Sequence, residues 1–422
     1  MSRKLIVLLL AVVLALVAAA QQPPEPQLNA GITGSYNGPD RLEPSRVLRE
    51  PRVARLMLDL AETPHDRAWL ESKLAGGEIT LDDLKTLGLV REENGRFVIA
   101  FSLFTRADVT KVRQAAGLRT ESLAEAYLTH RAEFEQALAR YNMPGVDRRA
   151  IAYILIGCFS LDWDGLDVTA VKKYRVAVRP RPGLGTFGVW AEEETPGLSL
   201  EGVYWGSHNE YFPDVVLTSF GDHFSLPRNA FPDLLWRADG TNWPAKMPEP
   251  LRDSLRLVEV DGWTNQVRQI GRLMLALRDG PRAAEELAKT AGFDESETQH
   301  ALALLAEVDY IRKEDGRYTA TIPVLTARDK LMMDDVLRIS RQIFSDWLAA
   351  NYEPIREDLA GITPLRYGVP YDEVFTQVWH YLFGIANKRL VENALLADPY
   401  APDRKFKGFV PAVWDRSLRN SR

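Results

Sequence analysis

Apolar residues between positions 267 and 308 recur at helical spacing in three successive groups. Gly280-Pro281 and Gly292 separate the groups, and glycine and proline interrupt helices. The pattern therefore predicts three amphipathic helices. Their apolar positions are Val267, Ile270, Leu273, Met274 and Leu277, then Ala283, Leu287, Ala288 and Ala291, then Leu302, Leu305 and Val308.

Two strand-like runs, residues 310–314 and 317–322, follow the third predicted helix. Asp315-Gly316 joins them, and both residue types tolerate the positive φ angles of a tight hairpin turn. The pattern over residues 267–322 is therefore three helices followed by a hairpin.

Much of this pattern occurs twice in the chain. Residues 55–64, RLMLDLAETP, return at 272–281 as RLMLALRDGP, with six identities in ten. Residues 81–108 then align without gaps to residues 302–329. The matched pairs include Leu81/Leu302, Leu84/Leu305, Arg91/Arg312, Gly95/Gly316, Arg96/Arg317, Thr105/Thr326 and Asp108/Asp329. Two similar blocks in the same order predict an internal duplication.

Three helices and a hairpin resemble the winged helix-turn-helix of bacterial repressors of the multiple-antibiotic-resistance and arsenic-responsive types. The resemblance rests on residues 280–292, GPRAAEELAKTAG, and on Asp315-Gly-Arg-Tyr318. The first copy shares the wing, Glu93-Asn-Gly-Arg-Phe97, more clearly than the helices before it. The resemblance implies two winged-helix modules in tandem.

The helical period resumes after each hairpin, so each module is expected to carry long trailing helices. The apolar positions are Leu123, Tyr127, Phe134, Leu138 and Tyr141 in the first copy, and Leu331, Leu337, Phe344, Trp347, Leu348 and Tyr352 in the second. In repressors of this kind such helices dimerise. The resemblance therefore implies a pseudo-dimer within one chain.

Charge argues against DNA as the partner. In the repressors the third helix enters the major groove and the wing touches the backbone, and neutralising phosphates needs basic residues. Residues 294–309 contain five acidic residues and no Lys or Arg, and residues 80–89 contain Asp82 and Asp83 against Lys85 alone. The net charge of the chain is −6.

The first twenty residues are typical of a bacterial secretory signal. Arg3 and Lys4 are followed by an apolar run from Leu5 to Val17 and by Ala18-Ala19-Ala20. We expect export to the periplasm or the exterior, with a membrane anchor as the alternative if the signal is not cleaved, and no membrane span after cleavage. Residues 21–50 are then expected to be a linker. The single cysteine, Cys158, lies in an apolar run and is expected to be a buried, inert thiol.

Residues 173–265 show short alternating runs separated by Pro and Gly, which predict a small antiparallel sheet rich in aromatic residues. The rings either form the core of this sheet or line a ligand pocket. The candidate ligand-binding residues are Trp190, Tyr204, Trp205, His208, Glu210, Asp222 and His223.

Other motifs in this segment are weaker. Gly183-Leu-Gly-Thr-Phe-Gly188 fits a phosphate-binding pattern, but a strand rather than a helix is expected to follow, so a glycine-rich hairpin is the better interpretation. His208, Glu210, Asp222 and His223 include residue types that bind zinc, although their spacing matches no known metal motif. We predict no catalytic residues, metal or cofactor.

The sequence thus predicts a helix-rich α+β protein in which winged-helix modules with trailing helices, residues 51–172 and 266–422, flank the β segment 173–265. The favoured function is an exported, non-catalytic binding or scaffold protein whose partner, a protein or a small ligand, is unknown. The alternatives are a membrane-tethered DNA-binding transcriptional regulator and a metal-dependent hydrolase that uses the His208/Asp222 region.

Overall fold

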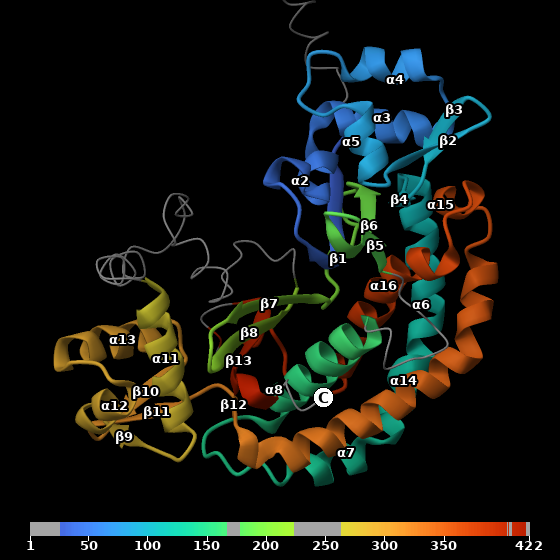
Figure 1. The fold of residues 1–422 in the computed structure, drawn as a ribbon. Coiled ribbons are helices and arrows are strands. Elements are labelled where there is room, and N and C mark those ends of the chain that lie inside the picture. The colour runs from blue at the N-terminus through green and yellow to red at the C-terminus, as the bar shows by residue number, and fades with distance from the viewer. Residues whose placement is uncertain (1–25, 167–177, 223–262, 403, 405–406, 419–422) are drawn as a thin grey trace, which may run out of the picture. The chain divides into compact units, whose positions relative to one another are not determined.

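The computed structural model describes residues 26–166, 178–222, 263–402, 404 and 407–418. It is an α+β protein, 53 % helical, with several small sheets, so the predicted fold class is confirmed at that level (Figure 1). The chain forms two compact units. Unit 1 contains the residues up to Ala107 together with Val178–Thr195 and Arg366–Val369, and unit 2 contains Asp108–Ala177, Pro196–Leu365 and Pro370–Arg422. The predicted signal, residues 1–20, lies outside the described residues.

Unit 1 combines a helical cluster, a hairpin and a small sheet. Its elements are β1 (Leu28–Tyr36), η1 (Asp40–Leu42), α2 (Pro44–Arg49), α3 (Pro51–Glu62), α4 (Arg67–Leu74), α5 (Leu81–Thr86), the hairpin strands β2 (Val90–Glu93) and β3 (Arg96–Ile99), β4 (Ser102–Phe104), β5 (Arg179–Arg181) and β6 (Gly185–Glu193). Strand β6 lies between β1 and β4, antiparallel to β1 and parallel to β4, and β5 pairs with β6.

Local chemistry explains where the helices of unit 1 begin. The side chain of Glu50 accepts a hydrogen bond from the backbone of Val53 at the start of α3, and Pro51 follows it at the first helical position, which needs no N–H. Thr80 and Asp83 form a reciprocal capping box at the start of α5. The buried side of α3, which includes Val53, Leu56, Met57 and Leu60, packs in the core of the unit.

Unit 2 contains the long helices and a second sheet. Its elements are α6 (Arg106–Thr129, beginning in unit 1), α7 (Arg131–Leu138), α8 (Arg148–Ala152), the π-helix η2 (Tyr153–Asp164), β7 (Gly206–Tyr211), β8 (Val215–Gly221), α11 (Trp263–Leu277), β9 (Arg282–Ala283), α12 (Ala284–Ala291), α13 (Glu295–Glu307), β10 (Ile311–Glu314), β11 (Arg317–Ala320), β12 (Val324–Leu325), η3 (Ala327–Asp329), α14 (Lys330–Asp358), α15 (Thr363–Arg366, ending in unit 1), α16 (Tyr371–Glu392), β13 (Phe409–Asp415) and η4 (Arg416–Leu418). The sheet order is β12-β13-β8-β7.

The sequence boundaries differ from this organisation in two places. The predicted linker of residues 21–50 contains β1 and α2, because residues 28–36 find a partner strand some 150 positions later in the chain. The predicted β segment 173–265 is divided: β6 belongs to the sheet of unit 1, and β7 and β8 belong to the sheet of unit 2. Residues 223–262 lie outside the described residues.

Two stretches of the chain have the same order of elements. Helices α3, α4 and α5 and hairpin β2-β3 correspond in order to α11, α12 and α13 and hairpin β10-β11. A short pairing after the first helix also recurs, because His65 pairs with Phe97 in one stretch and Arg282 pairs with Tyr318 in the other. The first residues of these pairs are 217 apart and the second are 221 apart, which are the two offsets of the sequence repeat.

The turns of the two hairpins have nearly the same backbone conformation. Asn94 and Gly95 have φ of 51° and 75°, and Asp315 and Gly316 have φ of 50° and 76°. Both pairs occupy the positive-φ region that a two-residue hairpin turn requires. The predicted turn at Asp315-Gly316 is therefore present, with its counterpart 221 residues earlier.

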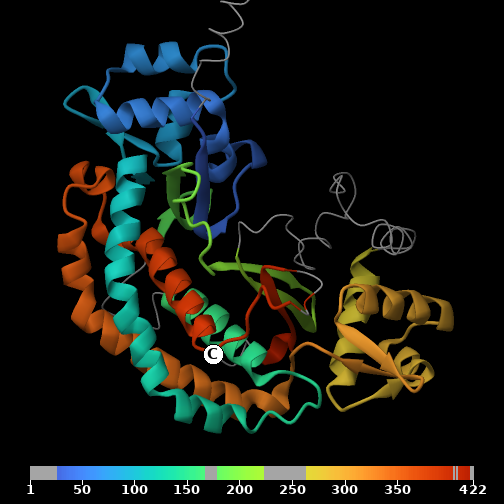
Figure 2. The ribbon, with the colours of Figure 1, turned by 180° about the vertical axis from the view of Figure 1, so that it is seen from behind.

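Helices α6 and α14 run side by side in opposite directions within unit 2 (Figure 2). Arg119 binds Asp358 at 2.8 Å, the Trp347 indole donates to the Ser122 hydroxyl at 2.9 Å, and Tyr127 and Ser340 share a hydrogen bond of 2.8 Å between their hydroxyls. As the position increases along α6, the partner position decreases along α14. The trailing helices of the two stretches thus contact each other directly.

Candidate functional site

Asp222, at the end of β8 in unit 2, lies within a group of tyrosines. Its side chain is 6 % exposed, and its backbone N–H donates to the carbonyl of Gly408 at 2.8 Å. The Tyr400 hydroxyl donates to the Asp222 carboxylate at 2.7 Å, and the Tyr400 ring lies 6.2 Å from that of Tyr204. Two predicted ligand residues, Tyr204 and Asp222, therefore share a neighbour.

Tyr153 completes this group, which we call the tyrosine cluster (Tyr153, Tyr204, Asp222 and Tyr400). Its ring centre lies 6.5 Å from that of Tyr204 and 5.5 Å from that of Phe220. The Tyr153 hydroxyl is buried and has no hydrogen-bond partner among the described residues. Burial first, and then Tyr204 and Asp222, raise the pKa of Tyr153 well above its usual value.

The phenols of the cluster stay protonated at neutral pH. Burial, assisted by Asp398, Asp222 and Glu392, raises the pKa of Tyr204 to about 12. A neutral phenol donates one hydrogen bond and accepts others. The cluster can therefore bind a polar group, but none of its tyrosines is a phenolate available as a base or nucleophile.

Trp205 packs beside the cluster against helix α16. Its ring lies 5.3 Å from the His380 imidazole in an edge-to-face arrangement, and a Cβ on Gly384 would approach the Trp205 Cβ to 3.2 Å. His380 is bonded through Nδ1 to the carbonyl of Thr376 at 2.8 Å, and burial lowers its pKa to about 4. Trp205 is 8 % exposed, so its ring belongs mainly to the core of unit 2.

The other predicted ligand residues are not part of this group. Trp190 belongs to unit 1, where it lies in β6 opposite Gly31 and is 6 % exposed. His208 and Glu210 pair through their backbones with Ser219 and Leu217, but their side chains lie outside the described residues, as does all of His223. Of the seven residues, the structure groups Tyr204 and Asp222, with Trp205 adjacent in sequence.

Asp162, on the π-helix η2, is a functional candidate that the sequence patterns did not reveal. Its side chain is 5 % exposed, and burial raises its pKa to about 8, opposed by a hydrogen bond from Ser207. The Ser207 hydroxyl also accepts from the Trp163 indole at 3.3 Å. π-Helices are rare and often occur at functional sites. An acidic residue inside an apolar run was the available signal. Cys158 on the same helix is buried, as predicted.

The hairpin arginines are paired with acidic residues. Arg91 contacts Glu93 at 2.7 Å in the first hairpin, and Arg312 contacts Glu314 at 3.2 Å in the second. Arg317 lies 3.4 Å from Glu286. Helix α13 contains three glutamates and no Lys or Arg over its described length. The hairpins and the third helix of the second stretch therefore present little unbalanced positive charge.

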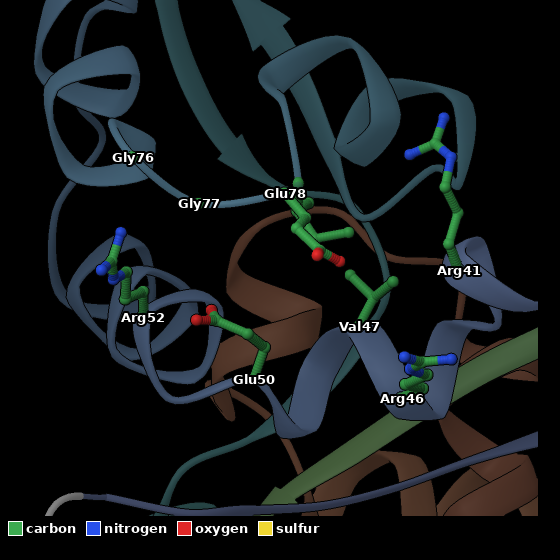
Figure 3. A pocket seen from close by; sticks show the side chains of 9 residues that line it. Arg41, Arg46, Val47, Glu50, Arg52, Gly76, Gly77 and Glu78 are labelled. Carbon is green, nitrogen blue, oxygen red and sulfur yellow. The ribbon is translucent and has the colours of Figure 1, made fainter.

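Unit 1 contains two hollows beside α3. The larger, about 310 Å³, is lined by Arg41, Arg46, Val47, Glu50, Arg52, Gly76, Gly77, Glu78 and Ile79 (Figure 3). The smaller, about 200 Å³, is lined by Pro26, Pro51, Arg52, Arg55, Leu56 and Lys73. Arg52 lines both hollows, so the two are adjacent. The sequence patterns did not reveal them because their linings come from separate short segments.

Among the described residues no group of three His, Cys, Asp or Glu is placed to hold a metal ion. No helix in the same part of the chain is long and apolar enough to cross a membrane. Comparison with protein-family models, with curated proteins and with solved structures finds no match to this chain.

Proposed function

We propose that this chain is an exported, non-catalytic binding protein built from two copies of one winged-helix unit that pair through their trailing helices. The observation that carries the proposal is the agreement of strand register between the two stretches. His65 pairs with Phe97 and Arg282 with Tyr318, at the offsets of 217 and 221 that the sequence repeat has. Independent folds of similar composition have no reason to share such registers.

Backbone hydrogen bonds at the end of the third helix support the same proposal. Leu89 donates to Leu84 at 2.9 Å and Tyr310 donates to Leu305 at 2.8 Å, and all positions differ by 221. The preceding residues, Gly88 and Asp309, both have positive φ, of 65° and 58°. Glycine adopts this conformation without strain, and aspartate tolerates it better than most residues.

The sheets extend the repeat beyond the winged helix. In unit 1, β6 lies between β1 and β4, antiparallel to the first and parallel to the second. In unit 2, β13 lies between β8 and β12 with the same two orientations. In each stretch the central strand comes from sequence after the long helix. The proposed repeat is therefore a strand, a winged helix, a short strand, a long helix and a returning central strand.

The contact between α6 and α14 supports the pseudo-dimer. Trailing helices of two separate repressor chains pair in the proteins that the sequence resembles, and here the ion pair of Arg119 with Asp358 and the bond between Tyr127 and Ser340 join the corresponding helices of one chain. With these helices already paired, we propose that the mature chain is a monomer in solution.

Binding rather than catalysis is favoured by the donors that the protein offers. The tyrosine cluster presents neutral phenols around one buried carboxylate, an arrangement that orients a ligand by hydrogen bonds. DNA is disfavoured because the arginines of the hairpins are paired with glutamates and α13 is acidic. An exported protein would also not meet the chromosome.

The first experiment separates this function from DNA binding. Residues 21–422 are titrated into a fluorescein-labelled 30-base-pair duplex at about 50 mM salt, where phosphate contacts are strongest. We expect no change in anisotropy. Binding that weakens steeply with salt, and that is lost in Arg96→Gln/Arg317→Gln but not in the matched control Arg67→Gln, would refute the proposal in favour of a regulator.

Export has its own test. Residues 1–25 are fused to an alkaline phosphatase that is active only outside the cytoplasm, and we expect active, processed enzyme. A fusion in which Leu8, Leu9 and Leu10 are changed to Asp serves as the control. Inactive enzyme from the unaltered fusion would contradict export without affecting the duplication.

A further inference from the structure

Four arginines follow one another at every third position on α2 and α3: Arg46, Arg49, Arg52 and Arg55. Arg49 has a structural role, because it donates to the carbonyl of Ala30 in β1 at 2.8 Å. Arg46, Arg52 and Arg55 are exposed and line the two hollows of unit 1. Each carries a positive charge that the fold must accommodate.

No carboxylate of the described residues lies within ion-pair distance of these three side chains. Arg52 donates only to the carbonyl of Ala75, at 3.0 Å, and no side-chain hydrogen bond joins Arg46 or Arg55 to the described part of unit 1. Other arginines of the same unit are paired, such as Arg41 with Asp83 at 3.2 Å and Arg67 with Glu71 at 3.2 Å. Three neighbouring cations without counterions stabilise nothing in this structure and repel one another.

The hollows place these cations on two sides of one opening. Arg46 borders the larger hollow, Arg55 and Lys73 border the smaller one, and Arg52 lines both. Gly76 and Gly77 leave room for the Arg52 guanidinium, since Cβ atoms there would lie 3.6 and 3.8 Å from its Nη1. Val47 and Ile79 supply an apolar floor in the larger hollow (Figure 3).

Two carboxylates lie at the edge of the larger hollow. Glu50 is engaged, because its Oε2 accepts from the backbone of Val53 at 2.8 Å, and Figure 3 shows its carboxylate on the side facing Arg52. Glu78 is exposed. With Arg41 balanced by Asp83, the two hollows together keep four cations, Arg46, Arg52, Arg55 and Lys73, against these two carboxylates.

The second stretch of the chain lacks this group of cations. At the offset of 217 that relates Arg55 to Arg272, Arg46, Arg52 and Lys73 correspond to Trp263, Gln269 and Thr290. Arg272 is balanced by Asp214 at 2.8 Å. The unpaired cations are therefore not a requirement of the common architecture.

We propose that the two hollows of unit 1 form a binding site for a ligand that carries several phosphate groups, held on both sides of Arg52. Arginine presents a planar fork that matches phosphate oxygens, and two adjacent forks favour a ligand with more than one phosphate. Glu50 and Glu78 accept hydrogen bonds from hydroxyl or amino groups of the same ligand. A soluble phosphate compound and a lipid headgroup share this chemistry.

The test uses residues 21–422 and two kinds of probe. Calorimetric titration compares inorganic phosphate with tripolyphosphate, and co-sedimentation compares phosphatidylcholine vesicles with and without 30 % phosphatidylglycerol. We expect tripolyphosphate to bind at least tenfold more tightly than phosphate. Binding to the anionic vesicles together with no binding of tripolyphosphate assigns the site to a lipid headgroup.

Variants decide whether the hollows are the site. Arg52→Gln and Arg55→Gln are each expected to weaken binding about tenfold, the loss of one charge-assisted hydrogen bond. Arg55 makes no bond within the described part of unit 1, so Arg55→Gln tests the site without disturbing the fold. Arg67→Gln, which removes the same charge from α4, is the control and should bind as the unaltered chain does.

Two outcomes overturn the proposal. One is no binding of either probe by the unaltered chain at about 50 mM salt. The other is an equal loss of affinity in Arg55→Gln and Arg67→Gln, which would mean attraction by net charge alone. Neither outcome affects the proposed duplication or the DNA experiment, because the site does not depend on them.

Discussion

Asp162 illustrates how a single buried side chain links the fold to pH. Its carboxyl lies on η2 within the core of unit 2, with the Ser207 hydroxyl as its hydrogen-bonding partner. Because burial disfavours the charged form, the folded protein keeps the proton up to a pH of about 8. The unfolded chain releases it near pH 4.

The sign of the resulting pH dependence follows from these two values. Below about pH 4 both states hold the proton, so Asp162 makes no difference. Between about pH 4 and about pH 8 only the folded state holds it, so the contribution of Asp162 to stability falls as the pH rises, and it is constant above. The total loss is on the order of 3 to 5 kcal/mol.

We therefore expect Asp162→Asn to remove this loss. The free energy of unfolding from urea titrations should differ little between the variant and the unaltered chain at pH 4, and should favour the variant progressively up to pH 8. Asp82→Asn, which changes an exposed carboxyl of α5, is the matched control. A difference that does not change with pH would mean that Asp162 is ionised in the folded protein.

Elements are held together in unit 1 by a close approach of β1 and β6. Gly31 pairs with Trp190, and a Cβ at Gly31 would lie 2.5 Å from Cζ2 of the Trp190 indole. The indole therefore covers the glycine. Trp190 was a candidate ligand residue from sequence, and this contact gives its ring a structural use.

A double-mutant cycle tests this contact. Gly31→Ala should destabilise the protein by about 1 to 3 kcal/mol, because the indole must move away from the new methyl group. In a Trp190→Phe background, where the overlapping ring atoms are absent, the same change should cost much less. Urea titration of all four proteins measures the coupling. Additive effects would show that Trp190 does not cover Gly31.

The helical elements follow local signals that sequence alone carries. The capping boxes of α5 and α13, the glycine after α12 with φ of 78°, and the two hairpin turns all lie where the residue types place them. The sheets do not follow such signals. Strand β4 has three residues and β12 has two, too few for periodicity to identify.

At the scale of the molecule, unit 1 is assembled from segments far apart in sequence. Its sheet order is β1-β6-β4, so β1 and β4 meet only through a strand from residues 185–193. Phe187, Val189 and Ala191 of that strand are buried in the same core as α3 and α5. A fragment that ends at residue 107 lacks both the central strand and this part of the core.

We expect residues 26–107 alone to fail to fold and a fusion of 26–107 through a glycine-serine linker to 178–195 to fold cooperatively. Thermal unfolding followed by circular dichroism distinguishes the two. A fusion in which Phe187 and Val189 are changed to Asp is the control, and it should resemble the shorter fragment. A cooperative transition in residues 26–107 alone would show that β6 is dispensable for the unit.

The sequence by itself determined the helix-rich α+β class, the burial of Cys158 and the order of helices and hairpin in the second stretch, because periodicity, caps and turns act over a few residues. Tertiary structure decided which strands pair, since β1 and β6 meet across more than a hundred residues of chain. It also decided that Trp190 lies apart from Asp222, that Asp162 keeps its proton, and that three arginines lie without counterions around two hollows. Pairing, burial and charge balance depend on neighbours in space, which no local pattern records.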